Sequence, residues 1–417
     1  MFASFSRLDL GITVGARKPG HIKTILSGPL PIFVYYDCVH KDMTRSALWR
    51  MRASLKQHNR VRDISVAGTS SCFDKFFRAT NCTFPMLEGL YLRSGRHDRV
   101  NIPDTFLGGP DLSVPHLRRL QLGHVTLTAI SRLLFSASNL THLDLCIDTA
   151  FGTSPETSLL AYLQGAPFLC RLGLCISESP GLLKSRSPPS TLKDIVRLSK
   201  LTSFHYMCHS EILDALVAGL SAPFLQDVRL EFNDENSSPI VHLSRFINET
   251  EEGCHALHVT FYKRVPRLLW FTRSGHCWLQ FRFRSDSGQS TEPIMRMSAA
   301  LSSKLTTVEE LRITFIKTAA AHYIPWCRFH QQFPNVKLIR VEGRNYSCIA
   351  RTFLQDQHVD DLAFFPALEK IELGEDKMES QESRMESRAA FDPFISARQQ
   401  AGRPVNVSFA RSWTCWG

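Results

Sequence analysis

The sequence lacks the apolar segments that carry a chain into or across a membrane. No run of residues approaches the ~18 consecutive apolar positions that a transmembrane helix needs. The N-terminus also lacks the charged, then apolar, then small-residue pattern of a secretory signal peptide. We therefore expect no membrane partner and a location in the cytoplasm, the nucleus or both.

The sequence also lacks paired cysteines. Its 12 cysteines include no Cys-x-x-Cys, and the nearest two, Cys170 and Cys175, would lie on one strand, where they are poorly placed for a zinc knuckle. Others, such as Cys146 and Cys348, stand in apolar segments and are interpreted as small core residues. This usage predicts a reducing compartment, no metal site and no cofactor.

Catalytic signatures are missing as well. The sequence contains no phosphate-binding glycine loop, no dinucleotide-binding glycine motif, no Gly-x-Ser-x-Gly and no His-Glu-x-x-His. Asp360 and Asp361 are adjacent and would not converge on one atom, and His205 and His209 would not converge because His205 lies in a strand segment. We expect no catalytic residues and a protein that is not an enzyme.

A short leucine-rich phrase, by contrast, is abundant. Its clearest copies are residues 84–92 (FPMLEGLYL), 114–122 (VPHLRRLQL) and 365–373 (FPALEKIEL), which share the pattern Pro-x-Leu-x-x-Leu-x-Leu. The first apolar position recurs eleven times at a mean spacing of about 28 residues, and the copy at Leu279 fits least well. These anchor positions are Leu87, Leu117, Leu140, Leu169, Leu201, Leu225, Ala256, Leu279, Val308, Val336 and Leu368.

The repeat predicts an α/β fold, a leucine-rich-repeat solenoid of horseshoe shape. Leu-x-Leu alternation indicates a strand with one buried face, and stacking of neighbouring units buries that face. Apolar segments with helical spacing, such as 126–135 and 211–220, should pack on the convex side of a concave parallel sheet. We expect one continuous domain, with atypical capping units at 1–66, repeats at 67–392 and a C-terminal cap and tail at 393–417.

The sequence also contains the short segments 2–4 (FAS) with 7–10 (RLDL), 60–62 (RVR), 103–109 (PDTFLGG) and 397–405 (ARQQAGRPV). Together with the repeats, these segments resemble fungal F-box-like leucine-rich-repeat proteins. The resemblance covers nearly the whole chain and implies a repeat domain that presents substrates to a Skp–cullin–F-box ubiquitin ligase. This sequence starts where the F-box of such proteins has ended. We expect either an F-box upstream, through which the ligase adaptor would bind, or an F-box-less relative.

The outward positions of the predicted strands give the candidate site. The residue between the last two apolar positions points away from the core, and in the second half of the chain this column is rich in arginine. Guanidinium groups bind carboxylates and phosphates in a bidentate manner, and the formal net charge is +10. The predicted partner-binding residues are His205, Arg229, Arg282, Arg312 and Arg340, with Thr260 as the interruption.

Three functions remain open. The first is a non-enzymatic interaction scaffold that recognises substrates for an F-box-type ligase by binding an acidic or phosphorylated protein segment. The second is a stand-alone recognition protein without a ligase link. The third is a nucleic-acid-binding solenoid, which the aromatic-poor column disfavours because it contains only Tyr91. A solvated arginine row without a partner is also open.

Overall fold

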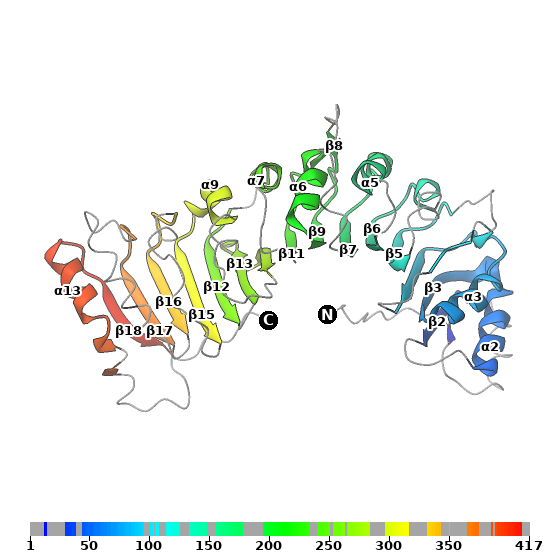
Figure 1. Cartoon of the computed structure of the whole chain (residues 1–417), viewed down its shortest axis with the longest axis horizontal. Coiled ribbons are helices and arrows are strands. Elements are labelled where there is room, and N and C mark those ends of the chain that lie inside the picture. The colour runs from blue at the N-terminus through cyan, green and yellow to red at the C-terminus, as the bar shows by residue number, and fades with distance from the viewer. Residues whose placement is uncertain are drawn as a thin grey trace. The chain divides into compact units, whose positions relative to one another are not determined.

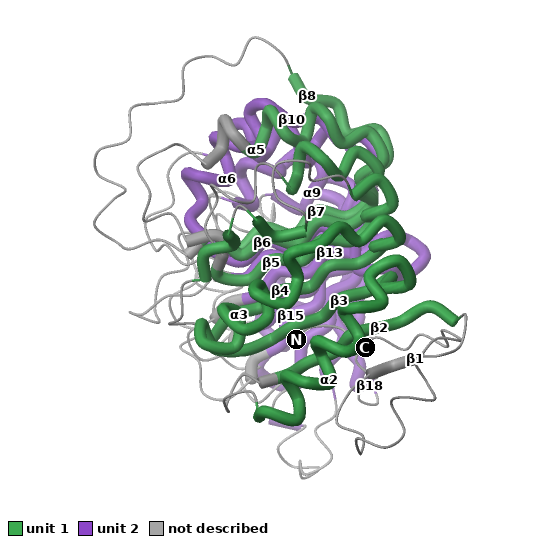
Figure 2. The backbone as a smooth tube through the Cα atoms, turned by 90° about the vertical axis from the view of Figure 1, so that its right-hand side faces the viewer, with its two compact units in different colours: residues 1–201 green, residues 202–417 purple. Residues whose placement is uncertain are grey.

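The computed structural model describes most of the repeat segments of the chain. The described residues are 12–14, 30–38, 44–95, 100–103, 105–107, 114–125, 133–148, 155–177, 195–232, 240–250, 253–262, 265–283, 297–316, 332–342, 350, 365–374, 385–386 and 388–410. The chain divides into two compact units, Met1–Leu201 and Thr202–Gly417, which Figure 2 shows in different colours.

A tight turn opens the repeats. In the copy at Phe84, the backbone N–H of Leu87 donates to the Phe84 carbonyl oxygen at 3.1 Å, and Pro85 occupies the second position of this turn, where its fixed φ angle is favourable. The same bond recurs from Leu117 to Val114 (3.0 Å) and from Leu368 to Phe365 (2.9 Å). All eleven anchor residues are at most 4% exposed. The proline-led phrase is thus a turn that buries its leucine and starts a strand.

The first unit contains a parallel sheet whose strands follow one another in chain order (Figure 1). Its strands are β1 (Ile12–Val14), β2 (Ile32–Cys38), β3 (Val61–Gly68), β4 (Gly89–Ser94), β5 (Arg119–Val125), β6 (His142–Asp148) and β7 (Arg171–Ser177). Its helices are α2 (Arg45–Leu55), the 3-10 helix η2 (His58–Arg60), α3 (Ser70–Phe77) and α5 (Pro155–Gln164), and a short strand β8 (Val196–Arg197) follows.

The second unit contains a sheet in the order β9-β11-β14-β13-β12-β15-β16-β17-β18. These strands are β9 (Ser203–Cys208), β11 (Asp227–Phe232), β12 (Ala256–Tyr262), β13 (Val265–Phe271), β14 (Cys277–Phe283), β15 (Glu310–Ile316), β16 (Leu338–Glu342), β17 (Lys370–Gly374) and β18 (Asn406–Ala410). The other elements are α6 (Ser210–Ala218), β10 (Leu220–Ser221), α7 (Val241–Asn248), α9 (Ser302–Leu305) and α13 (Asp392–Gln400).

Strand β13 is the exception to the predicted parallel sheet. It pairs antiparallel with both β12 and β14, whereas β14 is parallel to β11 and β12 is parallel to β15. Only residues 263–264 separate β12 from β13, and so short a connection can only reverse the chain. A turn at Thr272–His276, with Gly275 at φ +83°, then reverses it again into β14. The sheet therefore places β14 before β12, against their order in the chain.

Alternating burial along the strands divides each sheet into a core face and a polar face. Strand β9 shows the pattern, since Phe204, Tyr206 and Cys208 are at most 2% exposed while the residues between them are half-buried. The core face packs against helices: the rings of Phe204 and of Phe246 in α7 meet edge to face with 5.7 Å between centroids. The predicted α/β repeat solenoid is therefore confirmed within each unit, apart from β13.

The helical segment predicted at 211–220 is confirmed, because helix α6 covers Ser210–Ala218. Most of the other predicted helical segment, 126–135, lies outside the described residues. At the C-terminus, α13 ends before Gly402 at φ +71°, the left-handed residue that stops the helix. The segments 5–10, 178–190 and 285–293 lie outside the described residues, as does most of 374–388.

Candidate interaction surface

The five predicted site residues all lie on the polar face of the second unit. Their exposure differs widely, however. The side chains of Arg229 and Arg282 are 57% and 41% exposed, whereas the side chains of Arg312, His205 and Arg340 are only 17%, 22% and 23% exposed. A protein partner could therefore reach Arg229 and Arg282 first.

The strand register corrects the predicted single column. Arg229 pairs with His205 on β9, and Arg312 pairs with Arg340, as the phrase spacing predicts. Arg282, however, stands opposite Glu231, one pair further along the strand, and the residue opposite Arg229 is Gln280. Thr260 also lies outside the predicted column, because the residue opposite Arg312 is His258, whereas Thr260 stands opposite Thr314. The polar face thus carries two rows, and the arginines are divided between them.

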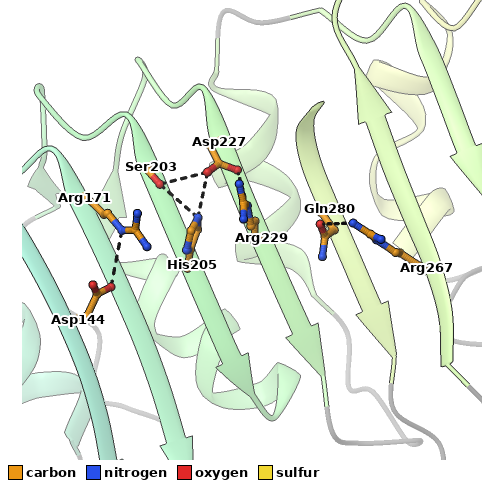
Figure 3. A network of polar contacts seen from close by, with 8 residues as sticks. All are labelled: Asp144, Arg171, Ser203, His205, Asp227, Arg229, Arg267 and Gln280. Atoms are coloured by element: carbon orange, nitrogen blue, oxygen red, sulfur yellow. Dashed lines mark hydrogen bonds and ion pairs between the residues drawn. The ribbon is translucent and has the colours of Figure 1, made fainter. Parts of the chain in front are cut away.

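Asp227 organises the polar face where β9 and β11 begin. Its carboxylate accepts hydrogen bonds from His205 Nε2 at 3.0 Å and from Arg229 Nε at 2.9 Å, and the Ser203 hydroxyl lies 3.4 Å away (Figure 3). Burial by itself would raise the pKa of Asp227, but the hydrogen bonds from His205 and Arg229 outweigh it and lower the pKa. The carboxylate therefore remains charged and holds Arg229 beside the strand.

A cluster of three arginines, Arg229, Arg267 and Arg282, lies where β11, β14 and β13 adjoin. Arg267 on β13 stands directly opposite Arg282 on β14, a like-charge pair that destabilises a sheet unless anions offset it. Burial and then the charges of Arg282 and Arg229 lower the pKa of Arg267. Arg267 donates from Nη2 to Gln280 Oε1 at 2.8 Å, but its buried Nε has no hydrogen-bond partner among the described residues (Figure 3). We call these three residues the arginine cluster.

The remaining predicted arginines are already neutralised. Glu310 accepts from Arg312 Nε at 2.5 Å and from Arg340 Nη1 at 2.8 Å. Arg340 Nε also reaches Glu372 at 2.9 Å, and Lys370 Nζ reaches the same carboxylate at 2.6 Å. This half-buried chain of charges links β15, β16 and β17, and it leaves Arg312 and Arg340 little capacity for an external anion.

The polar face also contains an apolar group that the sequence did not predict. Ala256, Leu269 and Phe271 are at most 8% exposed and cluster with Cys277 across β12, β13 and β14. Beside them His258 donates to or accepts from Thr314 Oγ1 at 2.9 Å, and burial, followed by the charges of Arg312 and Arg267, lowers the pKa of His258 to about 4. In the sequence this group is indicated only by the apolar run Leu268–Phe271. The sequence alone did not reveal that this run lies in a reversed strand, β13.

On the polar face of the first unit, glycines leave room for ion pairs. Asp63 on β3 reaches past Gly89 on β4 to Arg119 on β5, with 2.9 Å between Oδ1 and Nη2. Asp144 likewise lies over Gly173, where an added Cβ would approach its Oδ1 to 2.0 Å, and it pairs with Arg171 at 3.8 Å (Figure 3). In this unit the predicted outward residues of neighbouring strands do stand opposite one another. Tyr91 pairs with Gln121, Gln121 with Asp144, and Asp144 with Gly173.

The interpretation of Cys146 as a core residue was wrong. Cys146 and its in-register partner Cys175 are half-buried, and they lie on the polar face with Asp144 and Gly173. Since alternate residues of a strand share a face, Cys146 follows Asp144 outward while Leu143 and Leu145 point into the core. Cys348 and the pair Asp360–Asp361 lie outside the described residues.

Within the described part of the chain, no helix has the length and apolar character to span a bilayer. Nor do its histidines, cysteines and carboxylates form a group of three or more that could hold a metal ion. His205 lies within β9, and His209 occupies the position before α6 without a side-chain capping hydrogen bond.

Comparison with known proteins gives a fold likeness only. No protein-family model matches the chain, and no curated protein sequence matches it. Five solved chains match in structure, among them the leucine-rich-repeat-containing protein LegL7 from Legionella pneumophila. That match has 11% sequence identity and a TM-score of 0.32 and covers 86% of this chain and 98% of the other.

Proposed function

We propose that this protein is a non-enzymatic interaction scaffold that binds an acidic or phosphorylated protein segment at the arginine cluster. The observation that carries the proposal is the cross-strand pair of Arg267 and Arg282, with Arg229 beside it. The three arginines lie on adjoining strands. Arg229 forms an ion pair with Asp227, which His205 also contacts, and Arg282 lies 4.0 Å from Glu231. A carboxylate or phosphate group on a partner would offset the remaining positive charge.

The stacked repeats support a scaffold role because a broad strand surface presents many side chains at fixed spacing. The structure modifies the predicted site, however. Arg312 and Arg340 already share Glu310, so Arg267 replaces them as the residue expected to contact a partner. His205 is expected to act indirectly, by holding Asp227 and through it Arg229.

The test is affinity capture from native lysate with the full chain and a double variant, Arg267→Glu and Arg282→Glu. Charge reversal should remove at least one specifically captured protein, or lower its recovery tenfold or more. Arg273→Glu is the matched control, because Arg273 is an exposed arginine of the same unit in the turn after β13. Equal recovery by the wild type and the double variant would refute the site, provided that circular dichroism shows both folded.

Treating the lysate with phosphatase separates the two anion classes. A phosphorylated partner would be lost after treatment, whereas a partner that presents aspartate and glutamate side chains would be retained. Raising the salt concentration should weaken either complex, because exposed ion pairs are screened.

We further propose that the scaffold recognises substrates for an F-box-type ubiquitin ligase in the cytoplasm or nucleus. The support for this part is the resemblance of segments 103–109 and 397–405 to F-box-like leucine-rich-repeat proteins. Recovery of a Skp-type adaptor in the same capture would support the ligase role. Recovery of the arginine-dependent partner without any adaptor would instead favour a stand-alone recognition protein.

A further inference from the structure

Two cysteines of the first unit form a pair on the polar face of its sheet. Cys146 on β6 and Cys175 on β7 are in-register neighbours, and both are half-buried, so that small molecules in solvent can reach them. Their thiol groups are hydrogen-bonded to one another. Asp144 and Gly173 form the preceding outward pair in the same register.

A bulge in the adjacent strand brings His124 to this pair. The pairing of β5 with β6 shifts between Gly123 and Val125, and His124 adopts φ +58° at that point. A bulge of this kind re-aims a side chain that would otherwise alternate between faces. As a result the His124 ring lies against Cys146, with its Nε2 and Nδ1 atoms 3.8 and 3.9 Å from Sγ.

These contacts stabilise a thiolate at Cys146. The hydrogen bond from Cys175 and the bonds and charge of His124 together lower the pKa of Cys146, against the opposing effect of burial. Other cysteines behave in the opposite way: burial raises the pKa of Cys82 and of Cys277. Cys146 is thus distinguished by its surroundings from thiols of similar exposure.

The spacing also fits a disulfide. Neighbouring strands lie about 4.8 Å apart, and in-register residues on them fall within the ~4.4–6.8 Å between Cα atoms that a disulfide requires. We propose that Cys146 and Cys175 form a peroxide-responsive pair, in which hydrogen peroxide oxidises Cys146 and Cys175 then closes a disulfide between β6 and β7.

The chemistry balances with hydrogen peroxide as the oxidant. The Cys146 thiolate attacks one peroxide oxygen, the O–O bond breaks, and hydroxide leaves and takes up a proton to form water, so that Cys146 becomes a sulfenic acid. The Cys175 sulfur then attacks the Cys146 sulfur, the S–S bond forms and the S–O bond breaks. The departing hydroxide takes the Cys175 proton, and the sum is two thiols and one peroxide giving one disulfide and two waters.

The experiment exposes the reduced full chain to limiting hydrogen peroxide and quenches it with an alkylating agent. Mass spectrometry then follows each cysteine. Cys146 should be oxidised at least tenfold faster than Cys82, which is an internal control in every sample, and the product should be a peptide pair joined through Cys146 and Cys175. Oxidation of Cys146 no faster than Cys82, or a product without that linkage, would overturn the proposal.

Variants assign the roles of the partners. Cys175→Ser should stop at the sulfenic acid of Cys146, which a dione reagent traps. Cys170→Ser should leave the disulfide unchanged, and it is the control because Cys170 is a half-buried thiol immediately before β7. His124→Asn keeps a residue that tolerates positive φ and should slow oxidation of Cys146 about tenfold. A Cys175→Ser protein that accumulates no sulfenic acid would contradict the proposed order of steps.

Discussion

Gly89 offers the sharpest test of how the polar face of the first unit is built. A Cβ atom added at Gly89 would lie 1.9 Å from Oδ1 of Asp63, so the Asp63 side chain must move away. The edge of the Tyr91 ring, at 3.0 Å, needs to shift by only a few tenths of an ångström. Gly89→Ala should therefore break the ion pair between Asp63 and Arg119.

The size of the effect follows from the burial of that pair. The side chains of Asp63 and Arg119 are only 15% and 17% exposed, and Nη2 lies 2.9 Å from Oδ1. A charged hydrogen bond of this kind contributes about 1.5–3 kcal/mol. Alanine in a strand is favoured over glycine by roughly 0.5–1 kcal/mol, so Gly89→Ala should destabilise the unit by ~0.5–2.5 kcal/mol net.

The decisive comparison uses Asp63→Ala as a second background. There the ion pair is already absent, so adding Gly89→Ala should stabilise the unit slightly, by the ~0.5–1 kcal/mol of strand preference alone. Hydrogen–deuterium exchange of peptides from β3, β4 and β5 measures the opening free energy within this unit. Gly165→Ala is the control within the same unit, because its added Cβ would meet only the Tyr162 carbonyl oxygen, at an ordinary contact distance of 3.4 Å. The same cost of Gly89→Ala in both backgrounds would refute the reasoning.

Three further predictions concern the second unit. Asp214→Ala should destabilise the second unit by ~1–2 kcal/mol in urea unfolding. The reason is that the Asp214 carboxylate of α6 accepts a hydrogen bond from the Leu243 N–H at 2.8 Å and so caps the neighbouring helix α7. Asp214→Asn keeps an oxygen acceptor and should destabilise the unit less. Burial holds the pKa of His258 at about 4, below the ~6.5 of histidine in an unfolded chain. The unfolded chain therefore binds a proton first as the pH falls, and the free energy of unfolding should drop by about 3 kcal/mol between pH 6.5 and pH 4. His258→Gln should flatten this dependence when unfolding is measured at a series of pH values. Trp278→Phe should lower the free energy of unfolding by ~1–3 kcal/mol, because the buried Nε1 of Trp278 donates to the Leu225 carbonyl oxygen at 3.3 Å. A decrease below about 0.5 kcal/mol would contradict a contribution from this buried hydrogen bond.

The sequence predicted those parts of the fold that depend on local signals. Pro85 and Leu87 specify a turn and a buried anchor, and the alternation after them specifies a strand with a known outward residue. The register between Tyr91, Gln121 and Asp144 followed because these phrases are regular.

The sequence failed where the pattern loses its alternation. Residues 277–283 (CWLQFRF) are apolar on both faces near their start, since Trp278 and Leu279 are both buried, so Arg282 was assigned to the wrong row. Strand β13 contains no Leu-x-x-Leu phrase and was not recognised, and with it Arg267 was missed. The ion pairs of Glu310 depend on which strands adjoin, which no single segment specifies.

The signal that would have placed Cys146 correctly was available. Its position two residues after Asp144 puts both on one face, and counting along the strand would have moved it out of the core. Only the structure, however, could show that Cys175 is its direct neighbour and that His124 reaches the same sulfur.

The reversed strand β13 has a consequence for how the second unit folds. In a simple stack each repeat can form on the one before it, and the chain can be shortened by whole repeats. Here β11 has its parallel neighbour in β14, so the sheet cannot extend beyond β11 until residues as far as 283 have been made and folded back. Strands β12, β13 and β14 must therefore form as one cooperative block, and this block raises the sequence separation of contacts, which slows folding. A chain cut after β12 would leave β11 with an unpaired edge and a marked tendency to aggregate.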